Sequence, residues 1–460
     1  MQTFISKRGY SLIKDELNSS ELLSLRKELT VKPFINKDYP GDSNPFPVYL
    51  ESHKKIYLPR YYGIEKYGMA QKNNLKNGND IDVTFSKDLR EIQKNIVDTY
   101  LECANNIGGG IISVPCGYGK TVISLYILSK LKVKTLIIVH KEFLLNQWKE
   151  RIEQFLDGHK VGRIQGNVFD IKNKNIVLGM LQSISMKEYP EDAFDSFGLV
   201  IFDECHHLGA EVFSRALFKT SFKYTLGLSA TPKRTDGLQK VFEWYLGKIV
   251  FQIKKRNQET VNIKLFKYYN EDESYSKVEL NFQGKPNTSK MMNNICNYIP
   301  RNELIVTEIK KTIDDNRKVL ILSNRKSQLE AIFDMIGDYC DKGYYLGGMK
   351  EKELKKSEEK QLLLATFSMA EEGLDCKDLD TVFLVSPKSN IEQAVGRILR
   401  KEVDKREKIP LVVDFIDCFS TFERQGEKRI KFYKKSKYNI ETIDLTPFKQ
   451  TDNDEELDFI

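Results

Sequence analysis

Long apolar runs are missing from this 460-residue sequence. The longest, such as TLIIV at 135–139, fall far short of the roughly 20 apolar residues that a membrane-spanning helix needs. The first residues, MQTFISKRGYSLIKDE, also lack the uninterrupted apolar core of a signal peptide. We therefore expect an intracellular protein with no membrane partner.

Closely spaced cysteine pairs are absent as well. The seven cysteines are scattered along the chain, and no two stand at the spacing of a zinc-ligand pair. Reduced thiols in a cytosol-like compartment are the simplest interpretation, and we expect no structural zinc site.

Acidic and basic residues are unevenly distributed. The net charge is +7, but the last ten residues hold five acids and no base, so the rest of the chain carries +12. A basic body fits a polyanionic partner such as nucleic acid. Charge alone does not separate nucleic-acid-binding proteins from other basic proteins.

The first 85 residues differ in pattern from the sequence that follows. They lack its strand–helix alternation and contain proline and aromatic clusters, which predicts a separate accessory module with β-structure. From residue 86 onward, short unbroken apolar runs alternate with helical stretches. This alternation is typical of parallel strands covered on both faces.

Two α/β domains follow from this alternation. We expect the first at 86–251 and the second at 301–425, with a linker or insert at 252–300 where the pattern lapses. A C-terminal extension at 426–460 ends in an acidic tail, and terminal charge runs seldom pack. The predicted fold class is α/β with two parallel sheets.

The apolar run at 110–114 leads directly into a phosphate-loop sequence. Glycines there allow backbone N–H groups to approach phosphate oxygens, and the next helix adds its N-terminal dipole. Lys120 would reach the β and γ phosphates of ATP, and the Thr121 hydroxyl would hold Mg²⁺. The usual first glycine is Val114, but the flanking strand and helix favour nucleotide binding. The predicted nucleotide-binding residues here are Pro115, Cys116, Gly117, Tyr118, Gly119, Lys120 and Thr121.

Two acids end a later apolar run. GLVIF at 198–202 leads into Asp203 and Glu204. Because ligands bind at the carboxyl ends of strands in such sheets, these acids should lie beside the phosphate loop. We assign Asp203 to the Mg²⁺ shell and Glu204 to orienting and deprotonating the attacking water. The alternatives are two solvated acids starting a loop, or a metal site that includes His206 and His207.

Further short motifs accompany these acids. DECH at 203–206 resembles the DEAD/DEAH box of superfamily 2 helicases, and Ser229 to Thr231 resemble their motif III, which couples hydrolysis to nucleic-acid contact. Gln93 is similar to the glutamine of their Q motif, whose amide pairs with the adenine edge. The resemblance covers about residues 86–425. It implies two tandem RecA-like domains with the ATP site between them.

The second α/β domain contains sequences that resemble motifs V and VI. Gly373 and Asp375 belong to the first, and QAVGRILR resembles the second. On a helix, Gln393, Arg397 and Arg400 share one face. The resemblance implies that both arginines act as fingers that neutralise charge on the γ-phosphate. A basic stripe on a solvated helix is the alternative.

The resemblance also implies that both domains grip a nucleic-acid backbone through residues at strand ends. Polar residues at such ends are common in any α/β domain, so these assignments depend on the other motifs. The expected contact and coupling residues are Lys141, Gln147, Gln182, Ser183, Ser229, Thr231, Asn324, Arg325, Thr366 and Gln393.

Within the superfamily, VPCGYGKT, NQW, LSATPKRTDG and QAVGRILR look most similar to the group of XPB, UvsW and the poxvirus transcript-release helicases. Segments of the first 85 residues resemble the leaders of helicases from large DNA viruses. The resemblance implies an ATP- and Mg²⁺-dependent 3′ to 5′ helicase or translocase on duplex DNA, serving transcription, replication or recombination. Arg234, Thr235 and Asp236 replace the Arg-Glu-Asp element of XPB, which argues against XPB-like duplex opening.

Two other functions stay open at this point. One is an RNA helicase, because superfamily 2 grips backbone rather than bases. The other is an ATP-switched release or assembly factor that acts through RNA polymerase or other transcription machinery. A viral protein of either kind would act in the cytoplasm or nucleus, or be packaged in a virion.

Overall fold

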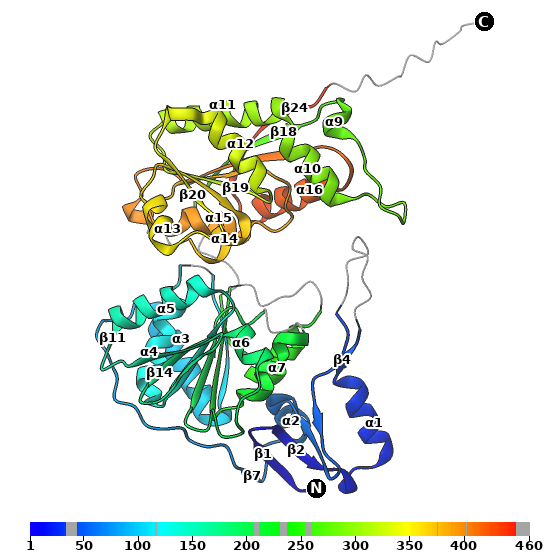
Figure 1. The fold of residues 1–460 in the computed structure, drawn as a ribbon, viewed down its shortest axis with the longest axis vertical. Helices are drawn as coiled ribbons and strands as arrows, with labels where there is room; N and C mark the ends of the chain where they lie inside the picture. The colour runs from blue at the N-terminus through cyan, green and yellow to red at the C-terminus, as the bar shows by residue number, and fades with distance from the viewer. Residues whose placement is uncertain are drawn as a thin grey trace, which may run out of the picture. The chain divides into compact units, whose positions relative to one another are not determined.

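The computed structural model divides into two compact units, Met1–Arg256 and Asn257–Ile460 (Figure 1). Within the part of the chain that it describes, no helix is both long and apolar enough to span a membrane. The described residues are 1–33, 44–115, 117–206, 211–230, 237–253, 259–374, 376–401 and 403–447, with the backbone alone at 212, 213 and 372.

Unit 1 begins with a small sheet and two helices. Its elements are β1 (Thr3–Ser6), β2 (Gly9–Ile13), α1 (Ser19–Glu28), β3 (Thr30–Val31), β4 (Phe46–Pro47), β5 (Leu50–Glu51), β6 (Lys55–Leu58), α2 (Arg60–Tyr67), β7 (Lys72–Asn73) and β8 (Thr84–Phe85). The strands of this N-terminal sheet are ordered β5-β6-β2-β1-β7, antiparallel except for the parallel pair of β1 and β7.

The N-terminal sheet is not a separate module, in contrast to the expectation. Tyr10 belongs to the same hydrophobic cluster as Leu136 of the following α/β domain. The buried Arg60 guanidinium donates to the backbone carbonyls of Ile107 and Phe222 at 2.8 and 3.1 Å. Residues 1–85 therefore fold against the α/β domain and share its core.

The α/β part of unit 1 contains an eight-stranded sheet. Its elements are α3 (Glu91–Ile107), β9 (Gly109–Ser113), α4 (Lys120–Leu131), β10 (Thr135–Val139), α5 (Glu142–Phe155), β11 (Leu156–Asp157), β12 (Val161–Gln165), β13 (Val168–Asp170), β14 (Ile176–Met180), α6 (Leu181–Met186), β15 (Leu199–Phe202), α7 (Glu211–Lys219), β16 (Tyr224–Ser229), α8 (Gln239–Leu246) and β17 (Ile249–Gln252). The order is β13-β12-β14-β10-β15-β16-β9-β17, and every pair is parallel except β12 with β13.

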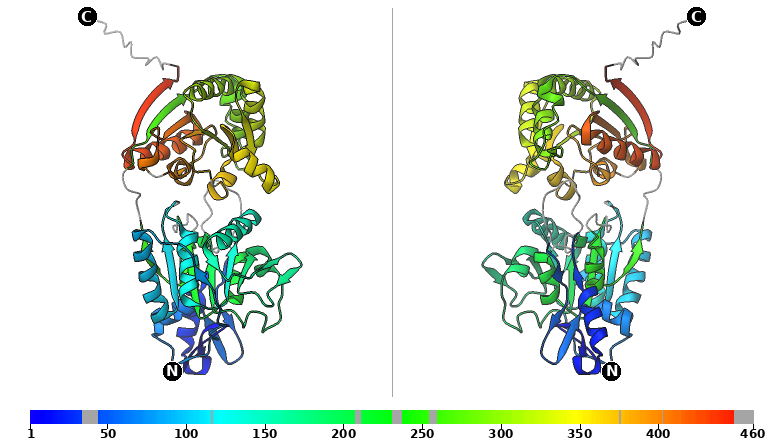
Figure 2. Two further views of the ribbon diagram at one scale, coloured as in Figure 1. Left: turned by 90° about the vertical axis from the view of Figure 1, so that its left-hand side faces the viewer. Right: turned by 90° about the vertical axis from the view of Figure 1, so that its right-hand side faces the viewer.

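Side chains of these strands fill two hydrophobic layers. Ile111 and Ile138 belong to the layer under α6, α7, α8 and the N-terminal sheet. Ile112 and Ile137 belong to the opposite layer, under α3, α4 and α5. Figure 2 shows helices on both faces of the sheet. Burial on both faces explains why the strands read as unbroken apolar runs, as predicted.

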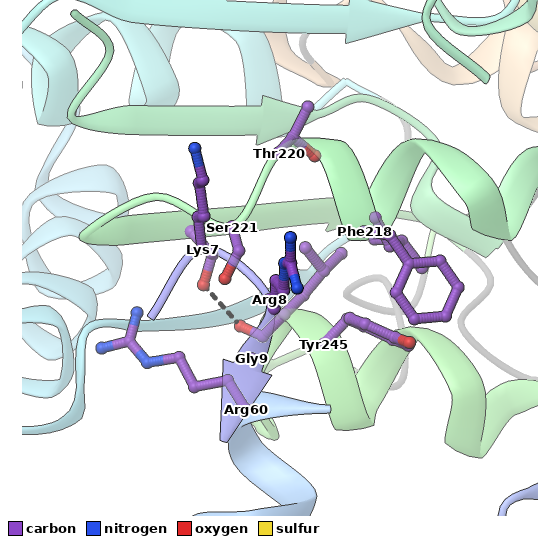
Figure 3. Close-up of a pocket in the computed structure, with 11 residues that line it drawn as sticks. Lys7, Arg8, Gly9, Arg60, Phe218, Thr220, Ser221 and Tyr245 are labelled. Carbon is purple, nitrogen blue, oxygen red and sulfur yellow. Dashed lines mark hydrogen bonds between the residues drawn. The ribbon is translucent and has the colours of Figure 1, made fainter. Parts of the chain in front are cut away.

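A pocket lies where the N-terminal sheet meets α7 and α8 (Figure 3). Lys7 and Arg8 line it together with Phe218 and Tyr245. Lys7 Nζ donates to the backbone carbonyl of Glu191 at 2.9 Å. No predicted site residue lines this pocket, so we assign it to the packing of the N-terminal sheet.

Unit 2 contains a seven-stranded parallel sheet. Its elements are β18 (Asn262–Tyr268), α9 (Glu273–Ser276), α10 (Thr288–Asn297), α11 (Ile299–Asp314), β19 (Val319–Ser323), α12 (Lys326–Ile336), β20 (Lys342–Tyr345), α13 (Glu351–Glu358), β21 (Leu362–Thr366), α14 (Phe367–Glu372), β22 (Thr381–Leu384), α15 (Glu392–Val395), β23 (Leu411–Asp417), α16 (Ser420–Lys435) and β24 (Asn439–Leu445). The order is β20-β21-β19-β22-β23-β18-β24. The predicted fold class of two parallel α/β sheets is confirmed.

The limits of the second domain differ from those expected. β18 lies in the segment 252–300 that was assigned to a linker, and β24 lies in the expected C-terminal extension, yet both are strands of the sheet. Their sequences, NIKLFKY and NIETIDL, mix apolar and polar residues, because one is next to the edge strand and the other is that edge. Such strands lack the unbroken apolar run on which the prediction relied.

Candidate nucleotide site

The predicted phosphate loop connects β9 to α4. Gly117 and Gly119 have φ angles of 89° and 81°, in the left-handed region. A Cβ atom at Gly119 would lie 2.5 Å from Gln93 Nε2, so this position requires glycine for its backbone and for space. Helix α4 begins at Lys120, and its first N–H groups lack partners within the helix. Cys116 lies outside the described residues.

Two side chains at the start of α3 hold the phosphate loop. Gln93 Nε2 donates to the Tyr118 carbonyl at 2.9 Å, and Gln93 Oε1 accepts from the Arg90 backbone N–H at 3.0 Å. Arg90 donates to the same carbonyl at 2.9 Å. These two bonds use one N–H and one lone pair of the Gln93 amide, which has two of each. The sequence placed Arg90 beside the Q motif but did not assign it this contact.

A chain of contacts joins the phosphate loop to the acids after β15. Lys120 Nζ lies 2.9 Å from Glu204 Oε1. His206 Nδ1 lies 3.4 Å from Glu204 Oε2 and 3.2 Å from Ser229 Oγ, at the end of β16. The structure therefore brings three predicted residues together, Lys120, Glu204 and Ser229. His206, the last residue of the DECH sequence and part of the alternative metal site, connects two of them.

The two adjacent carboxylates have opposite pKa shifts. Burial raises the pKa of Asp203, and the charge of Glu204 adds to this effect. Burial also acts to raise the pKa of Glu204, but Lys120 and His206 outweigh it and hold this pKa well below its usual range. Carboxylates whose environments separate their pKa values are typical of catalytic sites.

Asp203 has a partner that the sequence did not assign. The Trp148 indole Nε1 on α5 donates to Asp203 Oδ2 at 2.9 Å, and the ring is buried. Asp203 Oδ1 accepts from the Glu204 backbone N–H at 3.1 Å. Trp148 shares the buried face of α5 with Leu144 and Ile152. The helical spacing of these residues predicts that Trp148 is buried, but it does not predict that Asp203 is its partner.

The residues assigned to Mg²⁺ fit that ion. Asp203 supplies a carboxylate and Thr121 a hydroxyl, and Mg²⁺ prefers oxygen ligands. The described residues contain no cluster of three or more His, Cys, Asp or Glu side chains that could hold a metal ion. Mg²⁺ is usually bound by one or two carboxylates and by substrate phosphates, and Asp203 is the carboxylate that the sequence assigned to it.

Three predicted nucleic-acid residues of unit 1, Lys141, Gln182 and Ser183, follow the carboxyl ends of β10 and β14, whereas Gln147 lies on α5 and Ser229 ends β16. Lys141 precedes α5, and Gln182 is exposed on α6. The Ser183 hydroxyl accepts from the backbone N–H of Gly166 at 2.9 Å. These ends belong to the same edge of the sheet as Asp203. Several predicted positions lie outside the described residues: His207, Thr231, Arg234, Thr235 and Asp236.

Arg325 of unit 2 makes a contact that the sequence did not predict. It follows β19, and its Nε donates to Asn293 Oδ1 at 2.6 Å. Its guanidinium also donates to Ser289 Oγ at 3.1 Å. The neighbouring Asn324 donates to the Pro387 carbonyl at 2.8 Å. Arg325 is therefore bound to the first turns of α10.

The predicted arginine-finger helix is not a continuous α-helix. Helix α15 ends at Val395, and Arg397 lies in a 3₁₀ segment, Gly396–Leu399. The buried Arg397 guanidinium donates to the Leu374 carbonyl at 2.9 Å and to the Glu371 carbonyl. It is thus tied to the motif V segment of its own unit. Asp375 of that segment lies outside the described residues.

The remaining residues assigned in unit 2 lie near these motifs. Thr366 ends β21, and its hydroxyl lies 3.4 Å from Ser368 Oγ. Gly373 is buried directly after α14. Gln393 lies on α15, and Arg400 lies just after the 3₁₀ segment. Both side chains are half-buried.

Comparison with known proteins identifies the family. Residues 86–234 match the family model "Type III restriction enzyme, res subunit", and residues 301–402 match "Helicase conserved C-terminal domain". The chain is 36% identical over 453 residues to "Putative ATP-dependent RNA helicase L396" of Acanthamoeba polyphaga mimivirus, covering 96% of this chain and 87% of that protein. The chain belongs to the superfamily 2 helicases.

Other relatives of this helicase also come from viruses. "Putative helicase 161L" of Invertebrate iridescent virus 6 is 28% identical, covering 77% of this chain and 83% of that protein. "Probable helicase D10" of Escherichia phage T5 is 28% identical, covering 84% and 82%. The solved structure of T4 UvsW is 19% identical with a TM-score of 0.37, covering 97% of this chain and all of that one. The predicted resemblance to helicases of large DNA viruses is confirmed.

Proposed function

We propose that this helicase hydrolyses ATP at the site formed by the phosphate loop and the acids after β15, and that hydrolysis drives movement along DNA or separation of its strands. The observation that supports this most is the 2.9 Å contact between Lys120 Nζ and Glu204 Oε1. The phosphate-binding cation and the carboxylate that activates water must both act on the γ-phosphate. Two side chains that contact each other can both reach one substrate atom, and this supports a shared site for the γ-phosphate.

Each residue would have a separate task in hydrolysis. Asp203 and Thr121 would hold Mg²⁺, which neutralises phosphate charge when bound. Trp148 would keep the Asp203 carboxylate oriented and ionised. Lys120 would leave Glu204 for the phosphates, and Glu204 would then accept a proton from the attacking water. The loop amides would bind phosphate oxygens, as in other phosphate loops.

Two further contributions are part of the proposal. Gln93 would recognise the adenine edge with the second N–H of its amide nitrogen and the second lone pair of its amide oxygen. Arg397 and Arg400 would add positive charge that stabilises the transition state. Gly373 and Asp375 would belong to the same nucleotide-dependent machinery, as the motif V resemblance implies.

We propose DNA as the track. The motif sequences look most similar to the group of XPB, UvsW and the transcript-release helicases, and a basic body suits any nucleic acid. RNA is the second candidate, because the mimivirus relative is named an RNA helicase. Transcription, replication and recombination are the processes that such a motor would serve.

Strand displacement tests the track and the direction. Labelled DNA duplexes with a 3′ tail, a 5′ tail or blunt ends, and the same set in RNA, are incubated with ATP and the wild-type helicase, with Glu204→Gln as the blank. We expect displacement of DNA from the 3′-tailed duplex. Displacement of RNA alone would move the assignment to RNA, and ATP turnover without any displacement or nucleic-acid stimulation would favour a switch that acts through a polymerase partner.

A further inference from the structure

A hairpin of unit 2 carries an unusually exposed aromatic side chain. It occupies residues 277–287 between α9 and α10, and Figure 1 shows this segment extending away from its sheet. Phe282 is 86% exposed, more than any other large apolar side chain in the described part of the chain. Leu280 and Val278, in the segment that leads to it, are 56% and 46% exposed, and Leu280 forms an antiparallel bridge with Pro286. Single exposed apolar residues are common, but three that lead to the tip of one hairpin indicate a contact surface.

The tip has a defined conformation. Gly284 N–H donates to the Asn281 carbonyl at 2.9 Å, which closes a β-turn with Phe282 at its second position. Asn281 Oδ1 accepts from the backbone N–H groups of Gln283 and Lys285 at 2.9 and 3.1 Å. Gly284 has a φ of 71°, as such a turn allows. A preformed tip presents the Phe282 ring without an ordering cost on binding.

Both ends of the hairpin are anchored in the core of unit 2. Tyr275 on α9 is fully buried, and its hydroxyl donates to Asp417 Oδ1 at 2.7 Å. Met291 on α10 is fully buried in the same hydrophobic cluster as Tyr275. The exposure of Phe282 therefore belongs to a supported structure and not to a loosely held loop.

The base of the hairpin is bound to a residue expected to contact nucleic acid. Arg325 hydrogen-bonds to Ser289 and Asn293, two and six residues beyond the hairpin. Arg325 follows β19 at the carboxyl edge of the sheet, where the sequence predicts nucleic-acid contacts. The hairpin is thus connected, through α10 and Arg325, to the carboxyl edge of the sheet of unit 2.

The charge of the hairpin matches a polyanion. Lys277 and Lys285 lie within it with one acid, Glu279, whose Oε1 is 4.0 Å from Lys277 Nζ, and Lys290 follows on α10. Three acids, Glu271, Asp272 and Glu273, lie at the start of α9, so the excess of basic charge is at the tip of the hairpin and on its α10 side. Sequence-tolerant binders of single strands combine such cations, which contact phosphates, with an aromatic ring on which a base stacks.

We propose that the hairpin binds single-stranded nucleic acid, with a base stacked on Phe282 and phosphates near Lys277, Lys285 and Lys290. The proposal rests on the proposed function, because it assumes that nucleic acid is the track, but it concerns a contact outside the ATP site. Stacking accepts every base, so the contact suits a motor that moves over all sequences.

Affinity for single strands tests this proposal directly. Binding of labelled DNA and RNA oligonucleotides is measured for wild type, Phe282→Ala and Phe282→Trp, with Leu23→Ala as the matched control, because Leu23 on α1 is 63% exposed. We expect Phe282→Ala to weaken binding by about 5-fold or more. Phe282→Trp should bind as tightly as wild type and show more tryptophan quenching on binding than the two tryptophans of wild type show. Leu23→Ala should behave as wild type, and all variants should keep the basal ATP hydrolysis.

The outcomes separate this proposal from the proposed function. Equal single-strand affinity of wild type and Phe282→Ala would overturn the hairpin contact while nucleic-acid-stimulated hydrolysis still stood. A wild type that binds duplex but no single strand would also overturn it. Hydrolysis that no nucleic acid stimulates would contradict the proposed function instead.

Discussion

Lys120 Nζ and Glu204 Oε1 are 2.9 Å apart, and both side chains are largely buried. While this ion pair holds, Glu204 is a poor base, because the cation lowers its pKa. Phosphates entering the loop would attract Lys120 away and raise the proton affinity of Glu204. In the proposed mechanism, binding of ATP and activation of Glu204 as the base would therefore be linked through Lys120.

Substitution of Glu204 by glutamine separates ATP binding from turnover. Glu204→Gln removes the proton acceptor and the partner of Lys120, so turnover should fall by roughly 100-fold or more while ATP binds as well as in wild type or more tightly. Steady-state hydrolysis and binding of a fluorescent ATP analogue measure the two effects. Unimpaired turnover would remove Glu204 from its assigned role.

The Trp148 contact predicts a change in pH and Mg²⁺ dependence. The indole N–H lowers the pKa of Asp203, which burial raises, so Trp148→Phe should raise this pKa further. A protonated Asp203 cannot bind Mg²⁺. The acidic limb of the pH–activity profile should therefore move to higher pH by about one unit, and half-saturation should need more Mg²⁺.

The chain offers a matched control for this prediction. It contains only one other tryptophan, Trp244, which packs edge-on against Tyr62. Trp244→Phe should leave the pH profile and the Mg²⁺ requirement as in wild type. If Trp148→Phe also left both unchanged, Trp148 would be a packing residue and not a positioning residue for Asp203.

Arg397 tests the motif VI assignment. Arg397→Lys keeps the charge but loses the planar fork that binds the Leu374 and Glu371 carbonyls. We expect kcat to fall by about 1,000-fold, as for an arginine finger, with little change in the KM for ATP. Thermal unfolding must be compared, because Arg397 is buried. Equal losses of ATP binding and turnover would contradict a transition-state role.

A buried ion pair should dominate the stability of unit 2. Arg301 Nε lies 2.8 Å from Asp417 Oδ1, and neither side chain is exposed. Arg301→Met would leave the Asp417 charge buried without its cation, so the free energy of unfolding should fall by about 3–5 kcal/mol. Lys355→Ala, which removes an exposed pair with Glu351, should cost less than about 1 kcal/mol. Denaturant unfolding measures both, and equal costs would show that burial adds nothing to the pair.

Short contiguous motifs were predictable from the sequence. The glycines before Lys120 and the acids after β15 are fixed by chemistry over a few neighbouring residues, so they stand out in one sequence. Parallel strands buried on both faces were equally clear, because unbroken apolar runs mark them. β18 and β24 were missed because partly exposed positions of β18 and exposed positions of β24 admit polar residues.

Contacts between distant segments could not be predicted in this way. Trp148 and Asp203 are separated by 55 residues. Trp148 lies on a helix and Asp203 follows a strand, so no sequence periodicity predicts that their side chains meet. Arg90 and His206 were visible in the motifs, but their partners depend on how the chain folds. The packing of residues 1–85 onto the α/β domain depends in the same way on a shared core.

Nucleic-acid-stimulated ATP hydrolysis tests the central claim most directly. Steady-state turnover of the purified helicase is measured alone and with duplex DNA, single-stranded DNA or RNA, with Glu204→Gln and Lys120→Ala as blanks. We predict strong stimulation by DNA in wild type and turnover near background in both blanks. Hydrolysis that no nucleic acid stimulates, or that persists in both blanks, would contradict a nucleic-acid-driven motor powered at this site.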